Sequence, residues 1–432
     1  MKKSSNFRNR FLRIYDLLTG SNIKNILNDI DAHHSNYNET ATKSRLDLIL
    51  KHAKKTVPYY KNAETIDIKS FPVVNKQTIK NSIAQFTSQN YNRSKLISGT
   101  TSGSTGTPFK FYFDKRKKRR RTTEVIYYNG WANYRIGDKH LLNAVGIKKS
   151  KLKLFIQNEI ISNPKNIDTN WLEWQRKILK DKKIYIYIGY ASCLKEFAIY
   201  CNEQGDKPED FKLKGIITGS EKLDPKARNI AEKVFGCPVL SRYSSLETGI
   251  IAHECPEEKT FHLNTSSYFV EILHPTKDEP VKVGEIGRVV ITDLFNYGMP
   301  LIRYDIGDLA AFSQAECSCG RKGPCLSQIE GRIVENVTDT NGELVSWVAI
   351  NDIMWPFNDV VFFQFIQKNA NKYVMKIQAK PNNNLETDVK SKLQSLVGLD
   401  SILEIEFVDD IPALPSGKRP YIINEYLKNG KK

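Results

Sequence analysis

Residues 100–108 read Thr-Thr-Ser-Gly-Ser-Thr-Gly-Thr-Pro, and a β-prone run, Phe109 to Phe113, follows them directly. Glycines let a backbone approach an anion closely, and hydroxyl and N–H groups can then surround a phosphate. The stretch lacks the Gly-Lys-Ser/Thr ending of a Walker A loop. Its composition alone favours a flexible Ser/Gly/Thr linker, so the rest of the chain must decide between a linker and a phosphate loop.

Strand-like and helix-like runs alternate around this stretch, from about residue 95 to residue 330. Short apolar runs rich in β-branched and aromatic residues predict strands; they are HLLNAV (140–145), KIYIYIGY (183–190), KGIITG (214–219) and PVLSRY (238–243). Residues 191–204 and 224–235 are typical of helices. This alternation predicts an α/β architecture with mainly parallel strands, and residues 267–312 predict an antiparallel or barrel-like subdomain.

A second composition change follows Gly331-Arg332. Asn341-Gly342 is a hairpin signal, residues 385–398 predict a helix, and VVFFQFIQ, YVMKIQAK and ILEIEFVDD predict strands. We therefore expect two domains joined by a hinge. The first, 1–332, is a large α/β domain with mixed sheets and the barrel-like subdomain, and the second, 333–432, is small and α+β.

The sequence predicts neither a secretory leader nor a membrane span. The chain has 432 residues, of which 40% are hydrophobic and 26% charged, as in ordinary globular proteins. No apolar stretch follows the basic N-terminus, so cytoplasmic residence is expected. The net charge of +17 favours anionic partners such as nucleotides, phosphorylated acceptors, nucleic acid or an anionic membrane surface.

Later stretches, taken in order, reverse the linker interpretation. They read IITGSE at 216–221, YSSLETG at 243–249, RYDIGD at 303–308, Gly331-Arg332, and PSGK at 415–418. Together with residues 100–108 they resemble the motifs of the adenylate-forming superfamily, and within it the phenylacetate–CoA ligase-like family with its capsule-biosynthesis (CapK-like) branch. The matches run in family order over about three quarters of the chain.

The resemblance implies an ATP site built from several of these stretches. Residues 100–108 would hold the β- and γ-phosphates. The stretch 216–221 would lie beside the nucleotide, and the stretch 243–249 would close over adenine. Asp308 would bind the ribose hydroxyls, since a carboxylate facing a diol makes two charge-assisted hydrogen bonds. The residues assigned to ATP are Thr101, Ser102, Gly103, Ser104, Thr105, Gly106, Ser220, Glu221, Tyr243, Ser244, Ser245, Asp308 and Arg332.

Two residues receive catalytic roles from the resemblance. Glu247 would bind Mg²⁺, a hard ion that prefers carboxylate and water oxygens. Lys418 would act as a compact charge between the attacking carboxylate and the α-phosphate. Without the resemblance, Glu247 also fits a solvated acid at a helix start, and Lys418 fits an exposed lysine near the chain end.

The implied reaction joins a carboxylic acid to ATP and then transfers the acyl group to an acceptor. The acyl-adenylate is a general electrophile, so CoA thiol and a hydroxyl or amine of a surface-polysaccharide precursor are all chemically possible acceptors. CoA is the first expectation, although no motif in this sequence fixes a CoA site. Neither the acid nor the oligomeric state follows from the sequence.

The cysteines suggest a metal site. Cys317-Ser-Cys319 is a C-x-C pair with Cys325 close behind, and His253-Glu-Cys255 and His262 lie upstream. Thiolates and imidazoles in this number suit tetrahedral zinc, while reduced buried cysteines are the alternative. Some members of the resembled family carry such a zinc, which here implies Cys255, His262, Cys317 and Cys319 as ligands, with His253 and Cys325 as spare ligands.

The run Lys115-Arg-Lys-Lys-Arg-Arg-Arg121 precedes a helix-like segment at 122–135. We interpret the run as a solvated helix face. A nucleic-acid patch is the sharper alternative and supports the competing hypothesis of a basic nucleic-acid-binding protein. No nucleic-acid fold is recognisable around it, and that hypothesis leaves Glu247, Asp308 and Lys418 without a role. A landing site for a phosphorylated acceptor or an anionic membrane surface is a third alternative.

Overall fold

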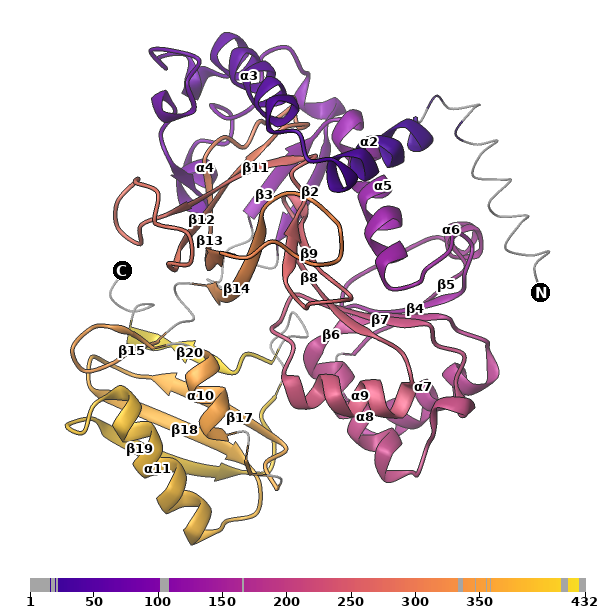
Figure 1. Ribbon diagram of the computed structural model, residues 1–432, viewed down its shortest axis with the longest axis vertical. Helices are drawn as coiled ribbons and strands as arrows, with labels where there is room; N and C mark the ends of the chain where they lie inside the picture. Colours follow the sequence, from indigo (N-terminus) through magenta and orange to yellow (C-terminus); the bar gives the residue numbers. More distant parts are fainter. Residues whose placement is uncertain are drawn as a thin grey trace. The chain divides into compact units, whose positions relative to one another are not determined.

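The computed structural model (Figure 1) describes residues 16, 20, 22–101, 109–164, 167–332, 337–345, 347–354, 356–357, 359–412 and 419–426. The chain divides into two compact units. The first contains the residues up to Ile306 together with Ala310–Gln328, and the second contains Gly307–Leu309 and the chain from Ile329 onward. The expected domain boundary at residue 332 remains a prediction.

A parallel arrangement in the order β8-β7-β6-β4-β5 forms one part of the large sheet of the first unit. Its strands are β4 (His140–Asn143), β5 (Glu159–Ser162), β6 (Ile186–Tyr190), β7 (Gly215–Gly219) and β8 (Val239–Ser245). These are the predicted α/β strands together with β5. The accompanying helices are α6 (Lys151–Gln157), α7 (Thr169–Asp181), α8 (Ala191–Glu203) and α9 (Pro225–Phe235), with the 3₁₀ turn η4 (Pro208–Asp210).

Neighbouring residues on these strands pack into different cores, because side chains alternate across a sheet. Tyr187 and Ile216 share a core with residues of α7, α8 and α9. Ile186 and Ile217 pack instead with Tyr128 of α5 (Lys115–Trp131). The sheet is therefore covered on both faces, which explains its continuous apolar strands.

The antiparallel strands continue the same sheet through the path β11-β12-β13-β14-β10-β9-β8. They are β9 (Gly249–Glu254), β10 (Phe261–Leu263), β11 (Tyr268–Leu273), β12 (Gly287–Asp293), β13 (Tyr304–Phe312) and β14 (Cys325–Arg332), and β1 (Val74–Asn75) adds to β13. Strands β2 (Ile97–Thr101) and β3 (Phe109–Phe113) form a separate pair.

The remaining elements of the first unit precede or follow this pair. They are α2 (Ile23–Ser35), α3 (Glu39–Thr56), η1 (Pro58–Tyr60), η2 (Ile68–Ser70), α4 (Lys76–Asn81) and η3 (Arg93–Lys95), followed by α5. No helix among the described residues is both long and apolar enough to cross a membrane.

The basic run lies inside α5, and its interpretation as a solvated helix face is right for four of its residues and wrong for Lys117 and Arg120. Lys117 is completely buried and Arg120 is 2% exposed, whereas Lys115, Arg116, Lys118 and Arg119 are exposed. The two buried cations face acidic and hydroxyl groups from distant segments. They are therefore taken up by the fold and not displayed to a nucleic acid.

The second unit has its own sheet in the order β19-β18-β17-β20 and its own core. Its elements are β15 (Val337–Thr338), β16 (Leu344–Val345), α10 (Trp347–Met354), β17 (Phe362–Gln367), β18 (Lys372–Gln378), α11 (Asn383–Val397), β19 (Ile402–Val408) and β20 (Ile422–Asn424). The predicted hairpin at Asn341-Gly342 joins β15 and β16. The fold class is confirmed: a large α/β unit with a mixed sheet and a small α+β unit.

Candidate active site and metal centre

Glu247 lies in the turn between β8 and β9 and is 7% exposed. The hydroxyl of Tyr304 donates a hydrogen bond of 3.0 Å to its Oε1. No hydrogen bond to Oε2 is found among the described residues, so this oxygen is available to a ligand. A carboxylate held through one oxygen is a suitable ligand for Mg²⁺.

Thr248, the residue that follows Glu247, is held by a hydrogen bond from Tyr268, and we call this contact the clamp. The Tyr268 hydroxyl donates a hydrogen bond of 2.5 Å to the carbonyl oxygen of Thr248. Gly249 has a φ of 112°, and a Cβ at this position would lie 3.1 Å from the Tyr268 hydroxyl. A side chain at residue 249 would therefore strain the backbone and crowd the clamp.

Lys117 of α5 completes the clamp. Its Nζ donates a hydrogen bond of 2.8 Å to the Tyr268 hydroxyl and lies 2.8 Å from Oδ2 of Asp293. Both charged side chains are 0% exposed. Burial raises the pKa of Asp293 even though the Lys117 ammonium lowers it. The basic run thus contributes a buried cation that supports the turn carrying Glu247.

The residues assigned to the nucleotide on β7 and β8 gather at the ends of these strands. Ser220 directly follows β7 and has a φ of 68°, and Oε2 of Glu221 accepts a hydrogen bond of 2.9 Å from the N–H of Ser192, in the first turn of α8. Tyr243, Ser244 and Ser245 occupy the end of β8. In open α/β sheets, ligands bind outside the carboxyl ends of the strands.

The phosphate-loop prediction falls largely outside the described residues. Ser102, Gly103, Ser104, Thr105 and Gly106 belong to the undescribed stretch 102–108. The flanking residues Thr101 and Phe109 are partners in the β2–β3 pair, which holds the two ends of the stretch side by side. The enclosed Oγ1 of Thr101 has no hydrogen-bond partner within the described part of the chain.

The stretch 303–308 contains two charged side chains that pair within the fold, and it also contains Asp308, the predicted ribose ligand. Arg303, with a φ of 45°, donates hydrogen bonds to both carboxylate oxygens of Glu271. Arg288 forms an ion pair of 2.8 Å with Asp305. Asp308 lies half-buried on β13, and Arg332 ends β14. Lys418 lies outside the described residues.

The predicted metal ligands come together. The ligand atoms of Cys255, His262, Cys317 and Cys319 all lie within 4.8 Å of one another. Three thiols and one imidazole at this spacing fit the ligand set of a closed tetrahedral zinc site. Cys255 directly follows β9 and His262 lies on β10, so the pairing of these two strands brings half of the set together.

The two spare residues lie near the tetrad and have other contacts. Cys325 Sγ is 3.3 Å from Nδ1 of His262, and Cys319 Sγ is 3.3 Å from Nε2 of the same ring. Cys325 is thus placed to orient the ring from the side away from Cys319. His253 stacks on Tyr128 with an interplanar angle of 8°, and burial lowers its pKa to about 3.

Sequence reasoning missed Tyr304, Tyr268 and Lys117. Tyr304 belongs to the RYDIGD stretch, and no local pattern distinguishes it from a core tyrosine. Lys117, Arg120 and Glu124 are spaced at i, i+3 and i+7 on α5. That spacing places them on one helix face and was the one signal that could have revealed a buried polar stripe.

Comparisons with known proteins agree with the fold and with the resemblance found in the sequence. Residues 337–425 match the family model described as the CapK C-terminal domain. Protein CapK of Staphylococcus aureus is 25% identical over 382 residues, which cover 84% of this chain and 82% of CapK. Phenylacetate-coenzyme A ligase of Thermus thermophilus is 28% identical over 183 residues, 40% of each protein.

Solved structures extend the likeness across the chain. The crystal structure of 2-hydroxyisobutyryl-CoA ligase in the postadenylation state, in complex with 2-HIB-AMP, has a TM-score of 0.76 and 18% identity, and the match covers 93% of each chain. ATP-bound MatB from Rhodopseudomonas palustris has a TM-score of 0.56 and 17% identity over 75% of this chain and 66% of MatB. At these identities the likeness establishes a shared fold.

Proposed function

We propose that this chain, an AMP-forming ligase of the adenylate-forming superfamily related to CapK and to phenylacetate–coenzyme A ligases, activates a carboxylic acid with ATP and passes the acyl group to CoA. The buried, hydrogen-bonded carboxylate of Glu247 at the carboxyl end of β8 is the observation that carries the proposal. It provides one oriented acidic ligand where an α/β sheet places its substrates.

The first half-reaction forms an acyl-adenylate. A carboxylate oxygen of the acid attacks the α-phosphorus of ATP, a new P–O bond forms, and pyrophosphate leaves with the electrons of the broken P–O bond. Catalysis of such a step is mainly positioning and charge stabilisation. Glu247 would hold Mg²⁺, which neutralises phosphate charge when bound. The stretch 102–108 would hold the terminal phosphates, and Asp308 would orient the ribose.

The second half-reaction transfers the acyl group. The thiol of CoA attacks the acyl carbon, a thioester forms, AMP leaves, and the thiol proton passes to solvent or a base. A hydroxyl or amine of a surface-polysaccharide precursor would react in the same way to form an ester or amide.

ATP–pyrophosphate exchange across a panel of carboxylic acids tests the first half-reaction without knowledge of the acceptor. We expect Mg²⁺-dependent exchange with one chemical class of acid. Product analysis after adding CoA, and separately after adding sugar acceptors, then identifies the acceptor. Exchange with none of the aliphatic, hydroxylated or aromatic acids, by protein that is folded, would contradict the proposal.

We also propose that the Cys255, His262, Cys317 and Cys319 tetrad binds a structural zinc ion. The donor set and the 4.8 Å spacing support this assignment. The four protein ligands would fill all positions of a tetrahedron around zinc, which favours a structural over a catalytic metal. Metal analysis of protein purified without chelator should give about one zinc per chain.

A further inference from the structure

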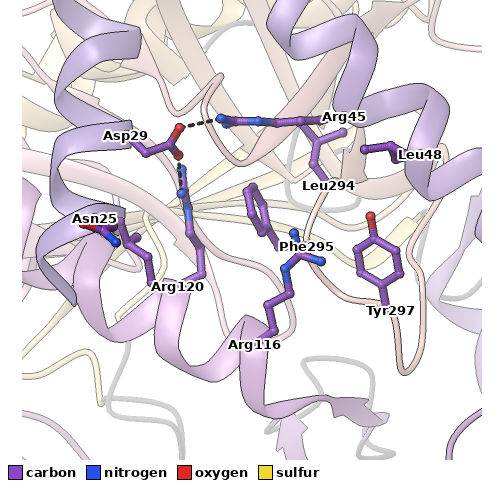
Figure 2. Close-up of a pocket in the computed structure, with 10 residues that line it drawn as sticks. Asn25, Asp29, Arg45, Leu48, Arg116, Arg120, Leu294, Phe295 and Tyr297 are labelled. Carbon is purple, nitrogen blue, oxygen red and sulfur yellow. Dashed lines mark hydrogen bonds and ion pairs between the residues drawn. The ribbon is translucent and has the colours of Figure 1, made fainter. Parts of the chain in front are cut away.

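A pocket lies among α2, α3, α5 and the loop after β12, apart from the residues assigned to ATP and zinc (Figure 2). Its volume is about 350 Å³, which falls within the range of small-molecule sites. Three arginines from two helices line it: Arg45 of α3 and Arg116 and Arg120 of α5. Phe295 forms an aromatic wall between them.

Two of the arginines are fixed by protein groups. Asp29 of α2 forms an ion pair with Arg45 through one carboxylate oxygen and with Arg120 through the other. Burial alone would raise the pKa of Asp29, but Arg120 and Arg45 lower it overall. The aspartate is therefore ionised at neutral pH. The fully buried Glu124 lies 3.7 Å from Arg120 as well. Two carboxylates therefore face the three arginines, and the guanidinium of Arg116 is the one that has no acidic partner among the described residues.

Arg116 is the third arginine and is exposed. Its guanidinium lies 5.2 Å from the ring centre of Phe295 and 4.9 Å from that of Tyr297. No carboxylate forms an ion pair with it within the described ranges of the chain. Packing against two rings limits the positions of this side chain, while its N–H donors remain available to a ligand.

We propose that this pocket binds the phosphate monoester of a small organic molecule. A phosphate monoester carries about −1.5 to −2 charges at neutral pH, and its oxygens can accept hydrogen bonds from more than one of the three guanidinium groups that line the pocket. Guanidinium groups bind phosphate oxygens in pairs. The volume exceeds that of a bare phosphate, and the apolar side chains of Leu48 and Phe295 would contact the organic part.

Two sources of this ligand chemistry fit an acyl-transfer enzyme: the 3′-phosphate of CoA and a sugar phosphate. The binding proposal itself does not rest on the proposed reaction, because it concerns residues without a role in ATP chemistry. Isothermal titration calorimetry without ATP should use CoA, dephospho-CoA, glucose 1-phosphate, glucose and inorganic phosphate as probes.

The variants compared are Arg116→Gln and Arg119→Gln, which remove the same charge from exposed positions of α5. Arg116 lines the pocket and Arg119 does not. We expect Arg116→Gln to weaken binding of a phosphate monoester about 10-fold or more, the scale of one charged hydrogen bond. Arg119→Gln should leave that binding within about twofold, since exposed charges away from the ligand contribute little.

The pattern of probes identifies the source. Tighter binding of CoA than of dephospho-CoA would assign the pocket to the nucleotide phosphate of CoA. Tighter binding of glucose 1-phosphate than of glucose would assign it to a sugar phosphate. The proposal is overturned if no phosphate probe binds saturably at millimolar concentration, or if Arg116→Gln binds the phosphate monoesters no more weakly than Arg119→Gln does.

Discussion

The hydroxyl of Tyr304 donates a 3.0 Å hydrogen bond to Oε1 of Glu247, across 57 positions of the chain. Tyr304 begins β13, and Glu247 lies in the turn after β8. The bond therefore links the antiparallel part of the large sheet to the end of its parallel part. It also fixes the direction of the carboxylate that we assign to Mg²⁺.

Replacement of Glu247 by Gln should abolish most of the adenylation activity. The amide keeps the size of the side chain but loses the charge that an Mg²⁺ ligand needs. We expect ATP–pyrophosphate exchange to fall at least about 100-fold, a typical scale for lost transition-state charge stabilisation. Near-normal exchange by folded Glu247→Gln would remove Glu247 from the mechanism.

Tyr304→Phe should have a smaller effect of the same kind. The variant keeps the carboxylate and removes the hydrogen bond that orients it, so exchange should fall about 10-fold with a raised Mg²⁺ requirement. The matched control is Tyr200→Phe, which removes a 2.9 Å tyrosine–carboxylate bond to Glu173 at the surface. Equal activities of the two variants would show that Tyr304 only packs.

Lys117→Met should destabilise the first unit by about 3–5 kcal/mol, because it leaves Asp293 buried without its partner. Urea unfolding measures this change, and Lys118→Met, at an exposed position, should stay within about 0.5 kcal/mol of wild type. The double variant Lys117→Met/Asp293→Asn should recover part of the loss. Wild-type stability of Lys117→Met would show that the contacts of Lys117 with Asp293 and Tyr268 do not support the turn that carries Glu247.

Strands with continuous apolar runs were predictable from the sequence. Residues 183–190 and 214–219 were expected as strands and contain β6 and β7, because both faces of these strands are covered by helices. The expected helix at 191–204 corresponds to α8, whose apolar side chains pack into the core beside the sheet. Here local composition and tertiary environment agree, so the pattern is sufficient.

The environment of α5 was not predictable in the same way. Seven consecutive basic residues predict a solvent-exposed segment. Lys117 and Arg120 are nevertheless buried, against Asp293 and Asp29 respectively. These partners lie more than 85 residues away in the chain, so no local pattern reveals them. The metal ligands differ, since the short C-x-C spacing of Cys317 and Cys319 is itself a local signal. The resemblance added Cys255 and His262, and the four side chains do meet.

Cys317→Ser should lower the zinc content and the thermal stability more than it lowers catalysis per folded molecule. The loop that carries Cys317 and Cys319 also contacts α2, where the N–H of Lys322 donates a 2.6 Å hydrogen bond to the carbonyl oxygen of His34. Loss of the metal should therefore loosen this contact as well. Zinc analysis and thermal unfolding measure both effects.

The control for the metal site is Cys237→Ser, at a buried cysteine outside the tetrad. This variant should keep its full zinc content even if it loses some stability. Equal zinc in Cys317→Ser and wild type would exclude Cys317 as a ligand. No zinc in wild-type protein purified without chelator would contradict the whole assignment.

Lys418→Ala should separate the two half-reactions. A lysine that neutralises charge between the carboxylate and the α-phosphate matters only while the adenylate forms, and closure of a lid or domain is a known way to complete an active site. We expect exchange to be crippled, ATP binding to change little, and acyl transfer from supplied acyl-adenylate to remain largely intact. Lys428→Ala, a lysine ten residues further along the chain, should match wild type in all three assays. If Lys418→Ala also matches wild type, the lysine is an ordinary exposed residue, and if all three activities fall together, the variant has lost more than this one charge.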